Sequence, residues 1–230
     1  MTQMTMPIPL LKASELFADL PDSVCEDIVS IARPTDYMCR QMVFLEGDPI
    51  TETFLLLDGR VKTTLLSQKG TEVILRLTNP GQLIGEPGLG FRSTHHSTAQ
   101  AIQESKVLVW RAETFGAALA RFPVLHRNAN RILRRRMDEM EKRVSEASTQ
   151  LASSRLAYSL TRLADQIGHK VNSHVEIDIS QEELGRMTSM TLYTVNRLLS
   201  NWETQGILRV RRQCVEIWNF LRLAALCEVE

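Results

Sequence analysis

Short apolar runs separated by glycine-containing turns dominate the chain from about Arg40 to Trp110. Turns fall at the pairs 47–48, 58–59, 69–70 and 80–81. Many short strands at spacings of about 8–12 residues are typical of a sandwich or barrel. The predicted strands are Met42–Leu45, Thr53–Leu57, Val61–Leu66, Val73–Leu77 and Lys106–Trp110. Helices are expected on either side, over Ala13–Ile31 and Thr114–Ala120.

A long helix is predicted from Pro123 to Ala147, because proline suits a first helical turn. Its seam positions are spaced alternately by four and three residues, which is the a/d pattern of a coiled coil. The seam consists of His126, Asn130, Leu133, Met137, Met140, Val144, Ala147 and Leu151. Charged residues on both sides of this seam favour a parallel homodimer, in which Asn130 fixes the register. The alternative is a single helix lying on its own domain.

Small polar residues from Ser148 to Ser154 predict a hinge, and Arg155–Ile167 predicts an amphipathic helix. After a short strand over Val175–Ile179, the sequence Ser180-Gln181-Glu182-Glu183 has the form of a capping box. It predicts a helix that ends near Met187.

A second helix is predicted to start after Thr191 and to end near Gln205, since Gly206 follows. Ile207–Val210 and Cys214–Trp218 then predict a hairpin. The hairpin tip is Arg211-Arg212-Gln213.

Composition narrows the class of protein. The 230 residues carry 27 Lys+Arg and 27 Asp+Glu, and no apolar run reaches the length of a membrane helix, about 18–20 residues. The start of the chain does not resemble an export signal. The four cysteines, Cys25, Cys39, Cys214 and Cys227, form no C-x-x-C pair. We therefore expect reduced, mostly buried thiols and a cytoplasmic location.

Positive charge is concentrated between positions 186 and 213, where five arginines accompany one glutamate, a local balance of +4. Two helices joined by a tight break and followed by a basic hairpin indicate a winged helix-turn-helix, whose second helix enters the major groove of DNA. One face of this helix is apolar, and the other predicts base contacts through Leu192, Tyr193, Asn196 and Arg197. The predicted phosphate contacts are Ser180, Gln181, Thr191, Thr194, Arg211 and Arg212. The alternative is a helical packing domain that does not bind nucleic acid.

The segments 43–62, 79–90 and 179–208, together with the long helix, resemble the CRP/FNR transcription regulators. The resemblance implies an α+β fold with an N-terminal β jelly-roll sensor of the cyclic-nucleotide-binding type, a long dimerisation helix and a C-terminal winged helix-turn-helix. We place these parts at 1–122, 123–151 and 152–230. It also implies a homodimer on a two-fold site in double-stranded DNA, control by a signal at the sensor, and contact with RNA polymerase if the protein activates transcription. Where some members read DNA with an Arg-Glu pair, this chain has Leu192 and Tyr193, whereas a later reading arginine is retained as Arg197.

Members that bind cyclic AMP hold the ribose with a Gly-Glu pair and the phosphate with an Arg-Ser pair. Gly85 and Glu86 match the first pair, but the second becomes His96 and Ser97. The permanent cation is missing, because histidine is only partly charged near neutral pH. The remaining pocket positions are Met140 and Glu141 on the long helix, and Arg92, which could substitute for the missing cation. The resemblance therefore predicts a degenerate pocket that does not favour cyclic AMP, and the effector stays open.

Other readings have weaker support in the sequence. An iron–sulfur sensor would need more N-terminal cysteines than Cys25 and Cys39. A haem sensor could use His95, His96 or His126 as an axial ligand. An enzyme is not expected, because adjacent loop histidines do not make a cupin metal site and no catalytic triad motif occurs. A cyclic-nucleotide-regulated interaction module would keep the phosphate arginine and lack the winged helix.

Overall fold

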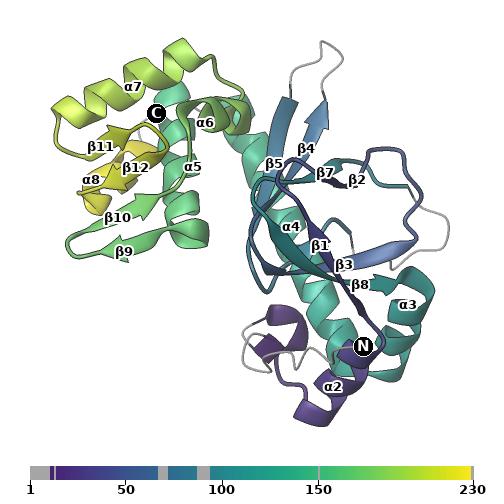
Figure 1. The fold of residues 1–230 in the computed structure, drawn as a ribbon. Coiled ribbons are helices and arrows are strands. Elements are labelled where there is room, and N and C mark those ends of the chain that lie inside the picture. The colour runs from purple at the N-terminus through teal and green to yellow at the C-terminus, as the bar shows by residue number, and fades with distance from the viewer. Residues whose placement is uncertain (1–10, 13, 67–71, 87–93, 150, 229–230) are drawn as a thin grey trace. The chain divides into compact units, whose positions relative to one another are not determined.

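The computed structural model describes residues 11–12, 14–66, 72–86, 94–149 and 151–228. The chain divides into two compact units, residues 1–138 and 139–230, and Figure 1 shows both. Each unit is described by itself below. In the described ranges, no helix combines the length and the apolar character required to cross a membrane.

Unit 1 is built on two antiparallel four-stranded sheets with the orders β1-β8-β3-β6 and β2-β7-β4-β5. The strands are β1 Arg33–Tyr37, β2 Met42–Phe44, β3 Glu52–Asp58, β4 Val61–Leu66, β5 Glu72–Thr78, β6 Leu83–Ile84, β7 Thr98–Ala101 and β8 Ser105–Arg111. Side chains of both sheets meet in one buried cluster that includes Phe44, Phe54 and Val107. This arrangement confirms the predicted jelly-roll class.

The central strands of the first sheet are buried on both faces, which explains their unbroken apolar runs. Alternate residues of β3 and β8, such as Leu55 and Trp110, point away from the second sheet into another cluster. The helices that close this cluster are η1 Glu15–Phe17, α2 Asp22–Ser30, α3 Ala112–Arg121 and the first part of α4 Pro123–Thr149. Trp110 is fully buried there and donates its indole N–H to the Ile28 carbonyl at 2.7 Å.

Unit 2 combines helices with a sheet of order β11-β12-β10-β9. After the end of α4, its elements are α5 Ala152–Ile167, β9 His169–Val171, β10 His174–Ile177, α6 Gln181–Thr188, α7 Leu192–Thr204, β11 Leu208–Arg211, β12 Cys214–Ile217, α8 Phe220–Ala225 and η2 Leu226–Glu228. The apolar faces of α5 and α7 supply the buried residues Leu160, Leu163, Leu199 and Trp202.

The helix predicted over Ala13–Ile31 is wrong as one element. Asp19 has a left-handed φ of 61°, and the segment is divided into η1 and α2. The polar hinge predicted at Ser148–Ser154 is also shorter than expected, because α4 continues to Thr149 and α5 already begins at Ala152. Ser154 is a buried residue of α5. Its small side chain marks close packing inside unit 2 and not a flexible linker.

Candidate nucleic-acid interface and sensor pocket

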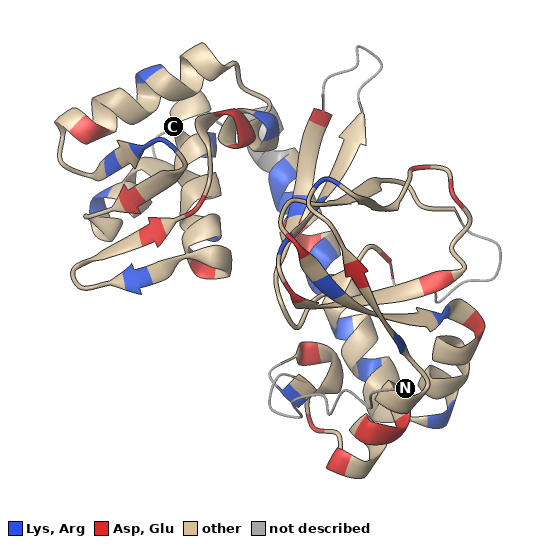
Figure 2. Cartoon of the chain, in the orientation of Figure 1, with Lys and Arg blue, Asp and Glu red and all other residues tan. Residues whose placement is uncertain are grey.

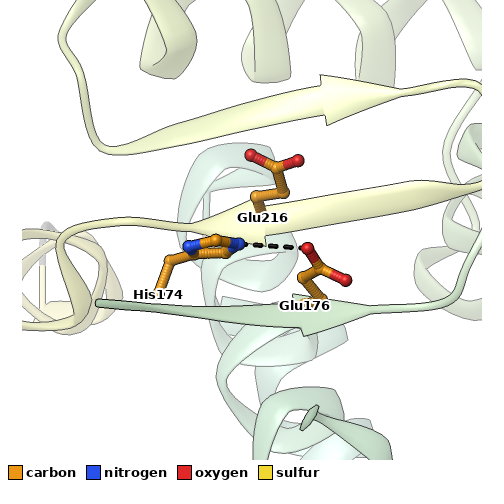
Figure 3. Close-up of side chains that lie close together, drawn as sticks. All are labelled: His174, Glu176 and Glu216. Atoms are coloured by element: carbon orange, nitrogen blue, oxygen red, sulfur yellow. Dashed lines mark hydrogen bonds and ion pairs between the residues drawn. The ribbon is translucent and has the colours of Figure 1, made fainter. Parts of the chain in front are cut away.

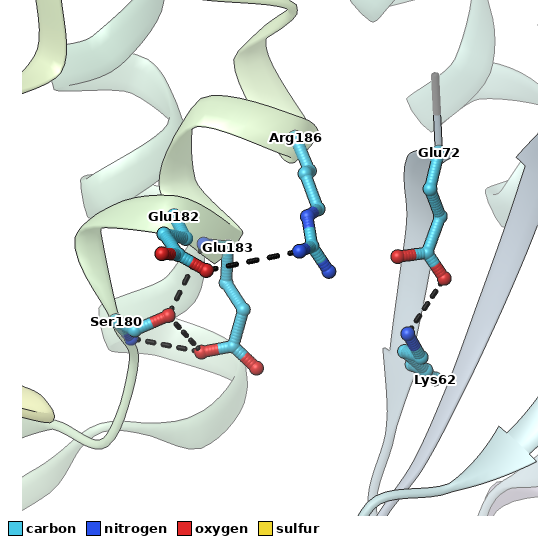
Figure 4. A network of polar contacts seen from close by, with 6 residues as sticks. All are labelled: Lys62, Glu72, Ser180, Glu182, Glu183 and Arg186. Carbon is cyan, nitrogen blue, oxygen red and sulfur yellow. Dashed lines mark hydrogen bonds and ion pairs between the residues drawn. The ribbon is translucent and has the colours of Figure 1, made fainter. Parts of the chain in front are cut away.

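Helix α6 begins with the predicted capping box, which Figure 4 shows. The Ser180 hydroxyl accepts from the Glu183 backbone N–H at 3.2 Å, and the Glu183 carboxylate accepts from the Ser180 backbone N–H at 2.8 Å. Arg186 pairs with Glu182 one turn earlier, at 3.7 Å. These contacts satisfy backbone donors at the helix start and fix where α6 begins. Figure 4 also draws Lys62 and Glu72, a separate pair 2.6 Å apart in unit 1.

The turn between α6 and α7 is fixed by backbone geometry. Ser189 adopts a left-handed φ of 56°, and the Met190 N–H donates to the Gly185 carbonyl at 2.9 Å. A Cβ atom at position 185 would lie 2.9 Å from the Met190 carbonyl oxygen, so a larger residue would push the turn away from α6. The two helices therefore meet at one defined angle.

Helix α7 presents the predicted reading face to solvent. Val195, Leu199 and Trp202 are at most 2% exposed, whereas Leu192 and Tyr193 are 49% and 77% exposed. Asn196 and Arg197 are exposed on the same face. At the helix start, the Thr191 hydroxyl accepts from the Thr194 N–H at 3.2 Å and lies 2.9 Å from the Thr194 hydroxyl.

Two polar residues of this face are already in contact across the turn. The Asn196 side-chain amide donates to the Gln181 side-chain oxygen at 3.1 Å, which joins a predicted base contact to a predicted phosphate contact. Arg197, by contrast, forms no hydrogen bond or ion pair with another described residue. Its guanidinium can therefore approach a ligand without first breaking a hydrogen bond or ion pair to the described part of the chain.

The hairpin of β11 and β12 is the wing, and its two tip arginines differ. The register pairs Arg211 with Cys214, and residues 212–213 form the turn. Arg211 makes an ion pair through Nε with the Glu216 carboxylate, which is 1% exposed. Arg212 is exposed and has no such partner among the described residues. A phosphate would therefore compete with Glu216 for Arg211 but not for Arg212.

Side chains of unit 1 pack closely around Gly85 and Glu86, the predicted sensor positions. Gly85 has a left-handed φ of 65°, and a Cβ at this position would lie 2.6 Å from Phe44 Cζ. The Phe44 ring stacks on His95, with ring centres 3.6 Å apart and an interplanar angle of 9°. His95 is 3% exposed, and its Nδ1 lies 3.5 Å from Glu86 Oε2. Contact with His95 lowers the pKa of the Glu86 carboxyl below its usual value of 4.5, against the opposing effect of burial.

Arg136 on α4 connects the long helix to this pocket. Its guanidinium donates to the backbone carbonyls of Leu83 and Gly85. A cavity of about 170 Å³ lies beside this contact. Its lining is Glu15, Arg76, Pro80, Gly81, Gln82, Leu83, Ile132, Arg135 and Arg136.

Comparison with known proteins identifies both units. The model of the cyclic nucleotide-binding domain matches residues 34–122, and that of the Crp-like helix-turn-helix domain matches residues 154–226. The chain belongs to the CRP/FNR family of transcriptional regulators. This regulator is 27% identical over 219 residues to the cyclic AMP receptor protein of Thermus thermophilus, covering 95% of this chain and 97% of the relative.

Two further similarities extend over most of the regulator. The CRP-like cAMP-activated global transcriptional regulator of Mycobacterium tuberculosis is 23% identical over 217 residues, 94% of this chain and 97% of the relative. The solved structure of FixK2 from Bradyrhizobium japonicum matches with a TM-score of 0.76 and 22% identity, over 87% of this chain and 99% of that one. The likeness to FixK2 shows a shared fold.

The predicted pocket residues of the regulator occupy different environments. Ser97 is buried, whereas the neighbouring His96, the expected replacement for the phosphate arginine, is exposed. Met140 and Glu141 are exposed on α4, and Arg92 lies outside the described residues. Sequence reasoning did not single out the contacts that Phe44 and Arg136 make at Gly85, or the contact of His95 with Glu86.

The expectation of mostly buried thiols also needs correction. Cys39 is exposed and Cys214 half-buried, so only Cys25 and Cys227 behave as buried thiols. The burial of Cys25 raises the pKa of its thiol, and the nearby Asp22 carboxylate adds a smaller increase.

Proposed function

We propose that this regulator binds a two-fold symmetric promoter site as a homodimer and reads each half-site with α7. The observation that carries the proposal is the division of α7 into a buried apolar face and a solvent-facing polar one. A recognition helix needs both, because one face anchors it and the other meets base edges. The site of action is promoter DNA in the cytoplasm, with contact to RNA polymerase where transcription is activated.

The side chains of this face have distinct expected roles. Arg197 suits the O6 and N7 atoms of guanine, Asn196 suits adenine once its contact with Gln181 opens, and Leu192 or Tyr193 suits a thymine methyl group. Thr191, Thr194, Ser180 and Gln181 stand near the helix starts, and Arg212 stands on the wing, where phosphates pass in complexes of this geometry.

The exposed seam of α4 supports the homodimer. Asn128, Ala129 and Ile132 on one side of the helix are buried within unit 1. The predicted seam lies on other positions: Met137 is 58% and Val144 62% exposed. The rest of the seam follows the same trend, with His126, Asn130, Met140 and Leu151 exposed and Leu133 half-buried, while the side chain of Ala147 lies outside the described residues. A second copy of α4 would cover these apolar side chains and place two recognition helices one DNA turn apart, roughly 34 Å.

The DNA-binding proposal is tested by affinity selection from random DNA with the purified chain, followed by binding measurements on the selected site. A palindrome is the expected product. Arg197→Ala should weaken the selected site and relax one base position, while the matched variant Lys170→Ala, an exposed cation on β9, should not. Selection of no sequence, or equal losses on selected and random DNA for Arg197→Ala, would contradict the proposed reading face.

The dimer is tested separately by light scattering or sedimentation. Met137→Glu combined with Val144→Glu places charge in the seam and should give monomers, because the apolar contact is lost and like charges face each other. Lys142→Glu is the control, since Lys142 is exposed on the same helix but outside the seam. Dimers that survive the double variant unchanged would exclude this seam.

We infer that cyclic AMP is not the effector of this regulator. Support comes from the exposed His96 at the position of the phosphate arginine in members that bind cyclic AMP, and from the Phe44–His95 stack beside Gly85. The effector is then another small molecule or none. If there is none, the chain should select its DNA site unaided, and in either case added cyclic AMP should not change the selection. The relatives named for cyclic AMP and the retained Glu86 favour the second candidate, a cyclic-nucleotide-responsive regulator. Selection that succeeds only with added cyclic AMP would establish it, with Arg92 or His96 holding the phosphate.

A further inference from the structure

The outer face of the wing sheet gathers side chains that neither DNA reading nor the sensor pocket uses. Val215 and Ile217 of β12 point into the core of unit 2, so Glu216 between them points to the other face. Glu176 of β10 lies directly opposite Glu216 in the strand register, and His174 lies two residues before Glu176 on the same face. Figure 3 shows the three side chains together.

These side chains are close; Glu216 is buried and His174 nearly so, whereas the Glu176 side chain is 35% exposed and can be reached by water. His174 Nε2 lies 3.1 Å from Glu176 Oε1, and one ligand atom from each of the three residues lies within 4.8 Å of the others. Glu216 is 1% exposed, and the buried Nδ1 of His174 has no hydrogen-bond partner among the described residues. Trp218 covers the group: its ring stacks on His174 with centres 4.5 Å apart, and its N–H donates to Glu216 Oε2 at 3.1 Å.

The charges of this cluster favour a cation. Two carboxylates that face each other across neighbouring strands destabilise a sheet, and burial of one of them adds to the cost. Figure 2 shows acidic positions on β10 and β12 beside basic ones on β11. Arg211 compensates Glu216, and Arg209 lies over the Trp218 ring at 5.8 Å. Glu176 is paired only with His174 among the described residues. Positive charge between the two glutamates would stabilise both.

We propose that His174, Glu176 and Glu216 bind a divalent transition-metal ion of the Zn²⁺ type. One imidazole nitrogen and two carboxylates are ligands that such ions accept, with further positions open to water. Ligand atoms about 2.1 Å from a tetrahedral zinc lie about 3.4 Å from each other. The contact between His174 and Glu176 is already near this value, and a side-chain rotation of Glu216 completes the set.

Metal binding has a consequence for the wing that rests on the proposed DNA binding. Arg211 and the ion use the same Glu216 carboxylate, so the bound ion weakens the ion pair that holds Arg211 on the sheet. The released guanidinium then lies at the wing tip and can take a DNA phosphate. The metal thus increases the number of phosphate contacts without touching the reading face of α7.

The site is tested without DNA, by equilibrium dialysis of the chelator-treated full chain with Zn²⁺. Because exposed thiols also bind zinc, the measurement uses a Cys39→Ser background. One ion per chain is expected. His174→Ala and Glu176→Gln should each weaken binding at least about tenfold. Glu182→Gln, which alters an exposed glutamate outside the cluster, should leave it unchanged.

A second readout locates the ion. Co²⁺ quenches nearby tryptophan fluorescence, and Trp218 stacks directly on the proposed ligand His174, whereas Trp110 and Trp202 are buried elsewhere in the fold. Quenching should saturate with one equivalent and disappear in Trp218→Phe, while Zn²⁺ binding by that variant persists. Failure to bind either ion, binding unaffected by His174→Ala and Glu176→Gln together, or loss of binding in Cys214→Ser alone would overturn the proposal.

The consequence for the wing is measured on DNA as the salt dependence of affinity with and without Zn²⁺. Release of Arg211 should steepen the slope of log K against log salt by about 0.9, the effect of one more phosphate contact, and Arg211→Ala should abolish the change. A chain that binds zinc but not DNA refutes the proposed function and leaves the metal site standing. A chain that binds DNA but no metal refutes the metal site and leaves the proposed function standing.

Discussion

Replacing Gly85 with alanine should destabilise the sensor unit through two separable effects. The left-handed φ of 65° costs a non-glycine residue about 1–2 kcal/mol. The added Cβ would also lie 2.6 Å from Phe44 Cζ and 2.9 Å from Cε1, whereas carbon atoms pack at about 3.5–4.0 Å. The ring must therefore move by about 1 Å.

The Phe44 ring has little room for this movement, because it stacks on His95 at 3.6 Å and tilts against Phe54 at 5.7 Å. Overpacking of this kind costs about 1–3 kcal/mol. Gly85→Ala is thus expected to lower the free energy of unfolding of unit 1 by about 2–5 kcal/mol. In a Phe44→Leu background the steric part should be relieved, which gives a coupling energy of about 1–3 kcal/mol, while the backbone part remains.

The assay is hydrogen exchange by mass spectrometry at increasing urea concentrations. Peptides from β3 and β8 report the stability of unit 1, and peptides from α7 serve as an internal control because they belong to unit 2. If Gly85→Ala lowered the free energy of unfolding of unit 1 by less than about 0.5 kcal/mol, the expected cost of the left-handed backbone at this position would be refuted. Strict additivity of Gly85→Ala and Phe44→Leu would refute the steric contact.

The other predictions concern four single side chains. Arg197→Ala should cost about 1–3 kcal/mol on the selected DNA site, whereas Arg212→Ala should weaken all sequences alike and flatten the salt slope, both measured by fluorescence anisotropy. Because His95 lowers the folded-state pKa of Glu86 below 4.5, ionised Glu86 contributes stability above that pH which is lost as pH falls through the lowered value. Denaturation between neutral and acid pH should therefore show a smaller acid loss in Glu86→Gln, and a loss identical to the parent would contradict the His95 contact. Asn128 is fully buried and donates to the Leu16 and Ala18 carbonyls at 3.1 and 2.7 Å. Asn128→Ala should therefore lower the melting temperature, because it leaves the buried Leu16 carbonyl unpaired, at about 1–3 kcal/mol, and removes the partner of the partly buried Ala18 carbonyl.

The elements that local chemistry determines were predicted well from the sequence. The capping box at Ser180, the cap at Thr191 and the end at Gly206 are local signals, and α6 and α7 begin and end within a residue or two of the prediction. The reading face follows from the helical period alone, which is why Leu192, Tyr193 and their neighbours are exposed as expected.

Elements that depend on distant partners were missed. β1 contains Pro34, which disfavours a strand in the sequence, but among the described strands β1 is an edge strand that pairs with β8, and proline is tolerated at an edge. β7 has the sequence TAQA, without strong strand formers, and exists because it lies between β2 and β4. The pairing of His95 with Glu86 and Phe44 likewise joins residues far apart in the chain.

The turn at Gly185, whose geometry is fixed by the backbone, affects how regulators of this kind can acquire new DNA sequence preferences. Because the angle between α6 and α7 is set by the backbone of residues 185–190, exchange of side chains on the outer face of α7 leaves the scaffold unaltered. New sequence preferences can therefore arise by substitution at a few exposed positions, at little cost in folding. The same property makes this helix a suitable place to graft the reading residues of another family member, because the presentation of those residues is inherited from the turn and not from their identity.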